Sequence, residues 1–160
     1  MGSDYALITG CSDGSIGSAL AREFLKHGVN VFATARDVGK MSSLKEIKGI
    51  KLLPLDVTSS TSIAEAVETV KVETGGKLKY LVNNAGGGYT MPTLDADLEK
   101  VKKMYDVNVF GVVAVTQGFA PLVIAAKGAI VNISSVAGVC YPAWTSKWLS
   151  TLHFCSDSLC

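Results

Sequence analysis

The residue types best suited to chemistry stand near the start of the sequence, in a nine-residue run that contains three glycines. This run, TGCSDGSIG, covers residues 9–17 and joins a short apolar segment to a stretch with helical periodicity. A strand, a glycine-rich turn and a helix N-terminus together form an anion site, because unpaired backbone N–H groups and the helix dipole point at the ligand. Glycine also lets a pyrophosphate approach the backbone closely. The run predicts a dinucleotide site, and a tight turn without a ligand is the simpler alternative. The contacts predicted from this run are Gly10, Ser12, Gly14, Ile16 and Gly17.

Five short apolar runs, each followed by turn residues, indicate the strands that must position this turn. They cover residues 5–8, 29–35, 51–55, 80–82 and 129–133. Helical periodicity is found between them, at 16–27, 59–73, 94–109 and 119–126. Strands that alternate with helices are typical of right-handed crossovers and a parallel sheet. The predicted fold class is therefore α/β, with a Rossmann-type doubly wound parallel sheet of strand order 3-2-1-4-5.

Length and composition limit the alternatives. The 160 residues are enough for one domain with a sizeable core, so we expect a single domain over 1–160. Fifteen Lys and Arg against fourteen Asp and Glu give a net charge of +1, which indicates neither nucleic acid nor an anionic membrane surface as a partner. Hydrophobic residues make up 48%, which fits a sheet buried on both faces. No apolar stretch reaches the ~18 consecutive residues that a transmembrane helix needs.

The cysteines indicate neither a metal site nor an oxidising compartment. Cys11, Cys140, Cys155 and Cys160 form no Cys-x-x-Cys pair and no spacing typical of metal ligands. We therefore expect no metal, and a reduced, cytoplasmic setting is the default.

Further motifs follow the glycine-rich run in a characteristic order. They are Asp56-Val57, Asn83-Asn84-Ala85-Gly86, Asn108, and Ile133-Ser134-Ser135. With them the chain resembles the short-chain dehydrogenase/reductase family over essentially its whole length. The family's first turn reads Thr-Gly-x-x-x-Gly-Ile-Gly, and here Ser15 is an extra residue within it. Residues 33–36 are most similar to a fungal branch that includes NADPH-dependent reductases of 1-acyldihydroxyacetone phosphate.

Charge at the end of the second strand bears on the choice of cofactor. An NAD enzyme places a carboxylate there to bind the adenosine ribose. Here Ala35 stands near that point and Arg36 follows, and a guanidinium can stack on adenine and pair with a 2′-phosphate. NADP(H) is thus the predicted cofactor, although Asp37 counts against it and a solvated surface arginine is the alternative. The further contacts that the resemblance implies are Asp56 and Val57 at the adenine, Asn84, Ala85 and Gly86 along the ribose and nicotinamide, and Lys147.

The catalytic residues are implied by the resemblance. The family moves hydride between a nicotinamide and a carbonyl or alcohol, while a tyrosine transfers the proton and a lysine four residues later lowers its pKa. In this chain Ser135 would hold the substrate oxygen, Lys147 matches the lysine, and Asn108 would help hold a proton-relay water. Ala143 stands four residues before Lys147, where the tyrosine is expected. Tyr141 is six residues before Lys147, which on a helix places it on the far side.

These observations support two main functions. The first is NADPH-dependent reduction of a small-molecule carbonyl, by resemblance acyl-dihydroxyacetone phosphate or a related lipid ketone, with impaired activity. The alternative is a catalytically inactive dinucleotide-binding or interaction protein. A methyltransferase would share the glycine-rich turn but leaves Asn84, Ser135 and Lys147 unexplained.

The resemblance also bears on assembly and location. The later strands of the family are missing from this sequence, so we expect the fifth strand to be an apolar edge that a homo- or hetero-oligomeric partner would cover. Peripheral association with the endoplasmic reticulum or lipid droplets is implied by resemblance only.

Overall fold

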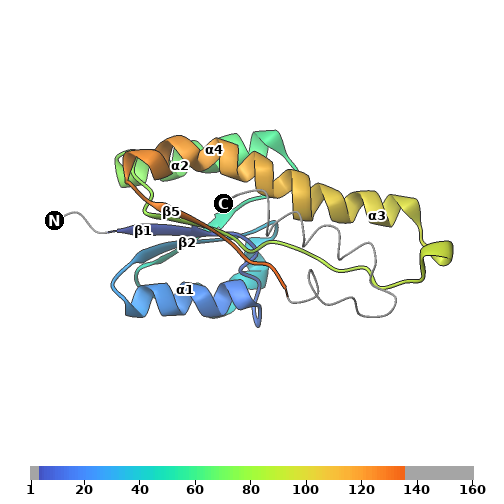
Figure 1. Ribbon diagram of the computed structural model, residues 1–160. Coiled ribbons are helices and arrows are strands. Elements are labelled where there is room, and N and C mark those ends of the chain that lie inside the picture. Colours follow the sequence, from blue (N-terminus) through green and yellow to red (C-terminus); the bar gives the residue numbers. More distant parts are fainter. Residues whose placement is uncertain (1–3, 136–160) are drawn as a thin grey trace.

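One parallel sheet lies between two layers of helices in the computed structural model, which describes residues 4–135 (Figure 1). The strands are β1 (Tyr5–Ile8), β2 (Asn30–Ala35), β3 (Ile50–Pro54), β4 (Tyr80–Asn83) and β5 (Ala129–Asn132). Their order is β3-β2-β1-β4-β5, and every pair is parallel. The predicted fold class and strand order are confirmed. Because the strands are parallel, their carboxyl ends meet at one edge of the sheet, where ligands bind in this architecture.

Helices cover both faces of the sheet. Helix α1 (Ile16–Lys26) lies on one face, and α2 (Ser60–Thr74) and α4 (Val112–Ala125) lie on the other (Figure 1). Alternate strand residues separate two apolar clusters. Leu7 packs on the α2 and α4 side, whereas its neighbours Ala6 and Ile8 pack on the α1 side. The sheet is thus buried on both faces, as the high apolar content predicts.

The third and fourth helices form one continuous run. Helix α3 (Leu98–Tyr105) passes through a π-helical turn, η3 (Asp106–Gly111), directly into α4. The predicted break between 109 and 119 is wrong, and so is the predicted start of the helix at 94. Leu94 lies in a separate 3₁₀ turn, η2 (Thr93–Asp95), with its side chain 98% exposed.

Gly111 and Gly118 lie within the stretch between the two predicted helices. The structure shows that these glycines serve close packing. A Cβ atom at Gly111 would lie 2.9 Å from Val57 Cγ2, and one at Gly118 would lie 2.9 Å from Ile63 Cγ2. Glycine therefore lets the helix approach α2 and the segment that follows β3, and the helix continues without interruption.

This long helix is apolar enough to invite a membrane interpretation. By length and composition alone, residues 98–125 could cross a bilayer. However, Val115 and Phe119 are fully buried in the cluster that α4 shares with β1, β2, β4 and α2. The helix is thus a core element of the domain.

Strand β5 is the edge of the sheet within the described part of the chain. It pairs with β4 alone, and Ile130 and Val131 remain 38% and 39% exposed. An apolar edge is present there, as expected. A partner that covers it stays a prediction.

Candidate functional site

The glycine-rich turn, residues 9–17, packs tightly against the loop that follows β4. Gly10 has φ +74°, and a Cβ atom there would lie 2.8 Å from Ala85 Cα. At Gly17 a Cβ atom would lie 2.6 Å from both Gly10 O and Asn84 Nδ2. These two glycines are therefore required by contacts inside the protein. Gly14 has open space around it, but its φ of +76° favours glycine.

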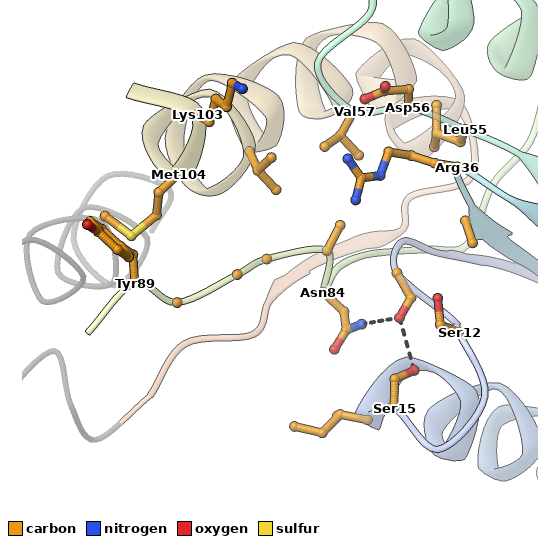
Figure 2. A pocket seen from close by; sticks show the side chains of 18 of the residues that line it. Ser12, Ser15, Arg36, Leu55, Asp56, Val57, Asn84, Tyr89, Lys103 and Met104 are labelled. Carbon is orange, nitrogen blue, oxygen red and sulfur yellow. Dashed lines mark hydrogen bonds between the residues drawn. The ribbon is translucent and has the colours of Figure 1, made fainter. Parts of the chain in front are cut away.

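Ser15, the extra residue of the turn, caps helix α1. Its backbone is extended, with φ −82° and ψ 163°, and its Oγ accepts a hydrogen bond from Ser18 N at 3.1 Å. The same hydroxyl donates to Gly10 O at 3.1 Å (Figure 2). The insertion is thus absorbed as an N-cap, which satisfies one of the otherwise unpaired N–H groups of the helix.

Thr9 joins the turn to the loop after β4. Its Oγ1 accepts hydrogen bonds from Asn84 N and Ala85 N, both at 2.9 Å. In return, Asn84 Nδ2 donates to Thr9 O at 2.7 Å and to Gly10 O at 3.0 Å (Figure 2). Two segments more than seventy residues apart are held together by these bonds. The sequence analysis did not predict Thr9 as a site residue. Its position directly before the first glycine of the turn could have indicated it.

A groove of about 690 Å³ runs along this junction, across the carboxyl ends of the strands (Figure 2). The predicted cofactor contacts that line it are Gly10, Ser12, Ile16, Arg36, Asp56, Val57, Asn84, Ala85 and Gly86. Gly14 and Gly17 are absent from its lining. Lys147 lies outside the described residues.

Helix α3 supplies a wall of the groove that sequence reasoning missed. Lys100, Lys103 and Met104 line it, and Val107 of the adjoining π turn η3 continues the same wall. Their spacing of three and four residues places them on one helical face, and this spacing could have predicted that they line the site together. Tyr89, from the loop after β4, lies beside them, with the Lys100 ammonium 5.6 Å from the centre of its ring.

The end of the groove near β2 and β3 combines a cation with apolar walls. Arg36 is exposed, and it makes no ion pair with any residue in the range 4–135. Hydrogen bonds from Thr58 N and Thr58 Oγ1 lower the pKa of Asp56, and the Arg36 charge lowers it further. Leu55 and Val57 are buried beside Asp56. The apolar walls at this end of the groove fit a flat ring, and the Arg36 guanidinium fits an anionic group attached close to that ring.

A second cavity of about 420 Å³ adjoins the first and shares Ile16 and residues 84–88 with it. Asn108 and Ser135, two of the three predicted catalytic residues, both line this second cavity. The third, Lys147, lies outside the described residues, as does Tyr141. The structure therefore brings the predicted serine and asparagine to the space next to the groove.

Asn108 lies in the π-helical turn and is 5% exposed. Its Nδ2 donates to Gly87 O and its Oδ1 accepts from Gly87 N, both at 2.9 Å. Asparagine fits poorly in a regular helix, and the π turn resolves the conflict because it redirects the side chain toward the loop after β4. Asn108 thus holds that loop where both cavities meet.

A buried amide network sets the end of β5. Asn83 Nδ2 donates to Asn132 Oδ1 at 2.9 Å and to Thr116 Oγ1 at 3.0 Å. It therefore links β4, β5 and α4 just before Ser135.

Burial raises the pKa of the Cys11 thiol to about 12, so this thiol is unreactive. The described residues contain no cluster that could hold a metal ion.

Comparison with known proteins agrees with this geometry. Residues 4–151 match the family described as short chain dehydrogenase. A short-chain dehydrogenase of Penicillium ochrochloron is 50% identical over 145 residues, which cover 91% of this chain and 54% of the relative. An NADPH-dependent 1-acyldihydroxyacetone phosphate reductase of Schizosaccharomyces pombe is 46% identical over 132 residues, 82% of this chain and 44% of the relative. The chain spans about half the length of such curated relatives.

Solved structures show the same likeness. A short-chain dehydrogenase from Streptomyces avermitilis has a TM-score of 0.85 at 27% identity, over 94% of this chain and 56% of that one. Serine dehydrogenase from Escherichia coli also has a TM-score of 0.85, at 29% identity, over 94% of this chain and 70% of that one.

Proposed function

The chain belongs to the short-chain dehydrogenase family, an oxidoreductase family that uses nicotinamide dinucleotides, and from this premise we propose that it binds NADPH and reduces a carbonyl. The observation that carries the proposal is Arg36, an exposed cation in the groove wall without an ion pair among the described residues. A guanidinium in that place can bind a 2′-phosphate, which NADH lacks. The printed name of the Schizosaccharomyces pombe relative, which is NADPH-dependent, supports the same cofactor.

The groove offers a path for the rest of the cofactor. Backbone N–H groups at the start of α1 would bind the pyrophosphate, because a helix N-terminus binds anions. The first turn of α1 carries no acidic residue that would repel the pyrophosphate. Leu55 and Val57 would flank the adenine, and the backbone of Ala85 and Gly86 would border the ribose. When bound, the nicotinamide supplies hydride.

The second cavity would then receive the carbonyl. We assign to Ser135 a hydrogen bond to the carbonyl oxygen, which would polarise it and hold it beside the hydride donor. Asn108 is a positioning residue that keeps Gly87 in place. Lys147 is assigned to the proton path and to the cofactor ribose. The proposed substrate class is a lipid ketone such as acyl-dihydroxyacetone phosphate, in a cytoplasmic setting.

A second candidate function rests on one sequence feature. Ala143 stands where the family's proton-transferring tyrosine would stand, four residues before Lys147. A chain that keeps the cofactor groove but lacks the acid would bind a dinucleotide without reducing substrate. This inactive binding or interaction protein is the alternative to an impaired reductase.

Parallel fluorescence titrations with NADPH and NADH test the cofactor proposal. We expect saturable binding that favours NADPH. Arg36→Ala is expected to weaken NADPH binding about tenfold, because it removes a charge-assisted hydrogen bond at an exposed site, and to leave NADH binding unchanged. Lys71→Ala, which removes an equal charge from α2, is the control. Equal affinity of the unaltered chain for both cofactors would contradict the proposal.

A further inference from the structure

A 3₁₀ segment follows β2 and packs against the glycine-rich turn. This segment, η1 (Val38–Leu44), receives the carboxylate of Asp13. Asp13 accepts hydrogen bonds from Ser43 Oγ at 2.6 Å, Ser42 Oγ at 2.7 Å and Ser43 N at 3.1 Å. The backbone adds a fourth bond, from Asp13 N to Lys40 O at 2.7 Å.

A second carboxylate near the groove is also turned toward η1. Asp37 is the N-cap of η1, and its Oδ1 accepts a hydrogen bond from Gly39 N at 2.9 Å. The segment itself is anchored, because Met41 and Leu44 are fully buried under the sheet. Both acids thus have their partners in one fixed element.

The groove lining reflects this arrangement. Ser12 and Arg36 each line the groove, yet their neighbours Asp13 and Asp37 are absent from its lining. The serine hydrogen bonds lower the pKa of Asp13, so its carboxylate is charged at neutral pH. Two negative charges therefore lie next to residues of the groove while facing away from it.

The direction of these charges matters for the ligand. A carboxylate that faces an adenosine ribose accepts hydrogen bonds from its hydroxyls and repels a 2′-phosphate, so it favours NADH. When hydroxyl and N–H donors bind the same carboxylate outside the groove, it no longer repels the 2′-phosphate, and a nearby cation can bind that phosphate.

We propose that η1 is a specificity-determining element, which binds the carboxylates of Asp13 and Asp37 outside the groove and so leaves Arg36 to select a 2′-phosphate. This inference rests on the proposed NADPH preference. It explains how the chain can carry an acid within its glycine-rich turn and another directly after Arg36.

The test weakens the contact between Asp13 and η1, and it measures by fluorescence the ratio of the NADH dissociation constant to the NADPH dissociation constant. Ser42→Ala with Ser43→Ala removes the hydroxyl donors. We expect the ratio to fall about two- to fivefold, as for exposed charge pairs, and to fall further at low salt. The matched control is the same pair of substitutions combined with Asp13→Asn. Without the carboxylate, the serine substitutions should leave the ratio unchanged.

An unchanged ratio in the original background, or an equal fall in both backgrounds, would overturn the inference. Failure of the proposed function is recognised separately, because the unaltered chain would then bind both cofactors equally and Arg36→Ala would have no effect. Thermal unfolding of each variant shows whether it is folded. If the double variant is unfolded, Ser42→Ala replaces it, again with and without Asp13→Asn. The expected fall in the ratio is then smaller, because both Ser43 hydrogen bonds still bind Asp13, and an unchanged ratio would again overturn the inference.

Discussion

Thr9 is the residue through which the two sides of the groove contact each other. One hydroxyl accepts hydrogen bonds from two successive backbone N–H groups, Asn84 N and Ala85 N. Thr9 itself is 1% exposed, so water cannot readily replace that acceptor. This one oxygen atom thus accepts both backbone N–H groups of the loop after β4 that bond to the glycine-rich turn, beside the two bonds that Asn84 Nδ2 donates.

Replacement of Thr9 by valine tests this role. Valine preserves the shape but leaves both N–H groups without the acceptor, so we expect a loss of about 1–3 kcal/mol in the free energy of unfolding. Urea denaturation measures it, and cofactor affinity should fall in parallel because the groove is distorted. Thr9→Ser retains the hydroxyl and should behave nearly as the unaltered chain. Equal destabilisation by serine would indicate a packing role instead.

Asp56 links stability to pH. Its pKa is lowered below 3.8 in the folded chain by hydrogen bonds from Thr58, with a further contribution from Arg36. A lowered pKa means that the group stabilises the fold above its unfolded pKa, and that this stabilisation is lost as the pH falls through the folded value. The free-energy difference between the unaltered chain and Asp56→Asn should therefore be largest near neutral pH and shrink below 3.8. A difference that stays constant with pH would contradict this.

At the scale of elements, the run from α3 to α4 brings three kinds of residue to the site. Its first turns line the groove, its π turn carries Asn108, and α4 contributes Thr116 to the amide network. One rigid helix therefore sets the relative positions of both cavities. Its close approach to Val57 depends on Gly111.

Gly111→Ala separates helix propensity from packing. Alanine is favoured over glycine in a helix by about 1 kcal/mol. Here, however, the added Cβ would meet Val57 Cγ2 at 2.9 Å and backbone oxygens of Asp106 and Val57 at 3.1 Å. We expect overpacking to outweigh propensity and to destabilise the fold by about 1–2 kcal/mol net in urea denaturation. Gln117→Ala, at an exposed position of the same helix, is the control. Stabilisation by Gly111→Ala would show that the contact relaxes freely.

At the scale of the whole molecule, the described residues form a five-stranded layer, and the groove and the second cavity lie at its carboxyl edge. Every proposed cofactor contact except Lys147 therefore lies within the described residues. The proton path depends on residues around Lys147, which lie outside the described range. Binding and chemistry can thus be tested separately.

Restoring the missing tyrosine provides that test. Ala143→Tyr places a phenol four residues before Lys147, as in the family's motif. If the chain is an impaired reductase, we expect ketone-dependent oxidation of NADPH to rise at least a hundredfold, as is typical of general acid catalysis. Ala143→Phe adds the ring without the hydroxyl and should give no increase. Measurable ketone reduction by the unaltered chain, at a rate that matches Ala143→Tyr, would exclude the inactive-protein alternative.

Much of this molecule could be predicted from local patterns. The apolar runs determined the strands to within about two residues, because each is a short stretch suited to a buried sheet. The order of motifs pointed to the family, and most of the predicted cofactor contacts do line the groove. Local patterns failed at 110–118, where the structure has one continuous helix and its two glycines permit close packing against Val57 and Ile63.

The sequence by itself determined the fold class, the family and the residue types of the site, since periodicity and motif order are local properties of the chain. Only the tertiary structure decided how Thr9, Asn108 and Asp13 act. Each of them bonds to a segment 21 to 76 residues away, and no local pattern specifies such a partner. The direction of the Asp13 carboxylate likewise depends on where η1 packs, whereas Asp37 caps η1 through a local bond to Gly39 N. The sequence shows which charged residues lie near the groove, and the fold determines which of their side chains face the ligand.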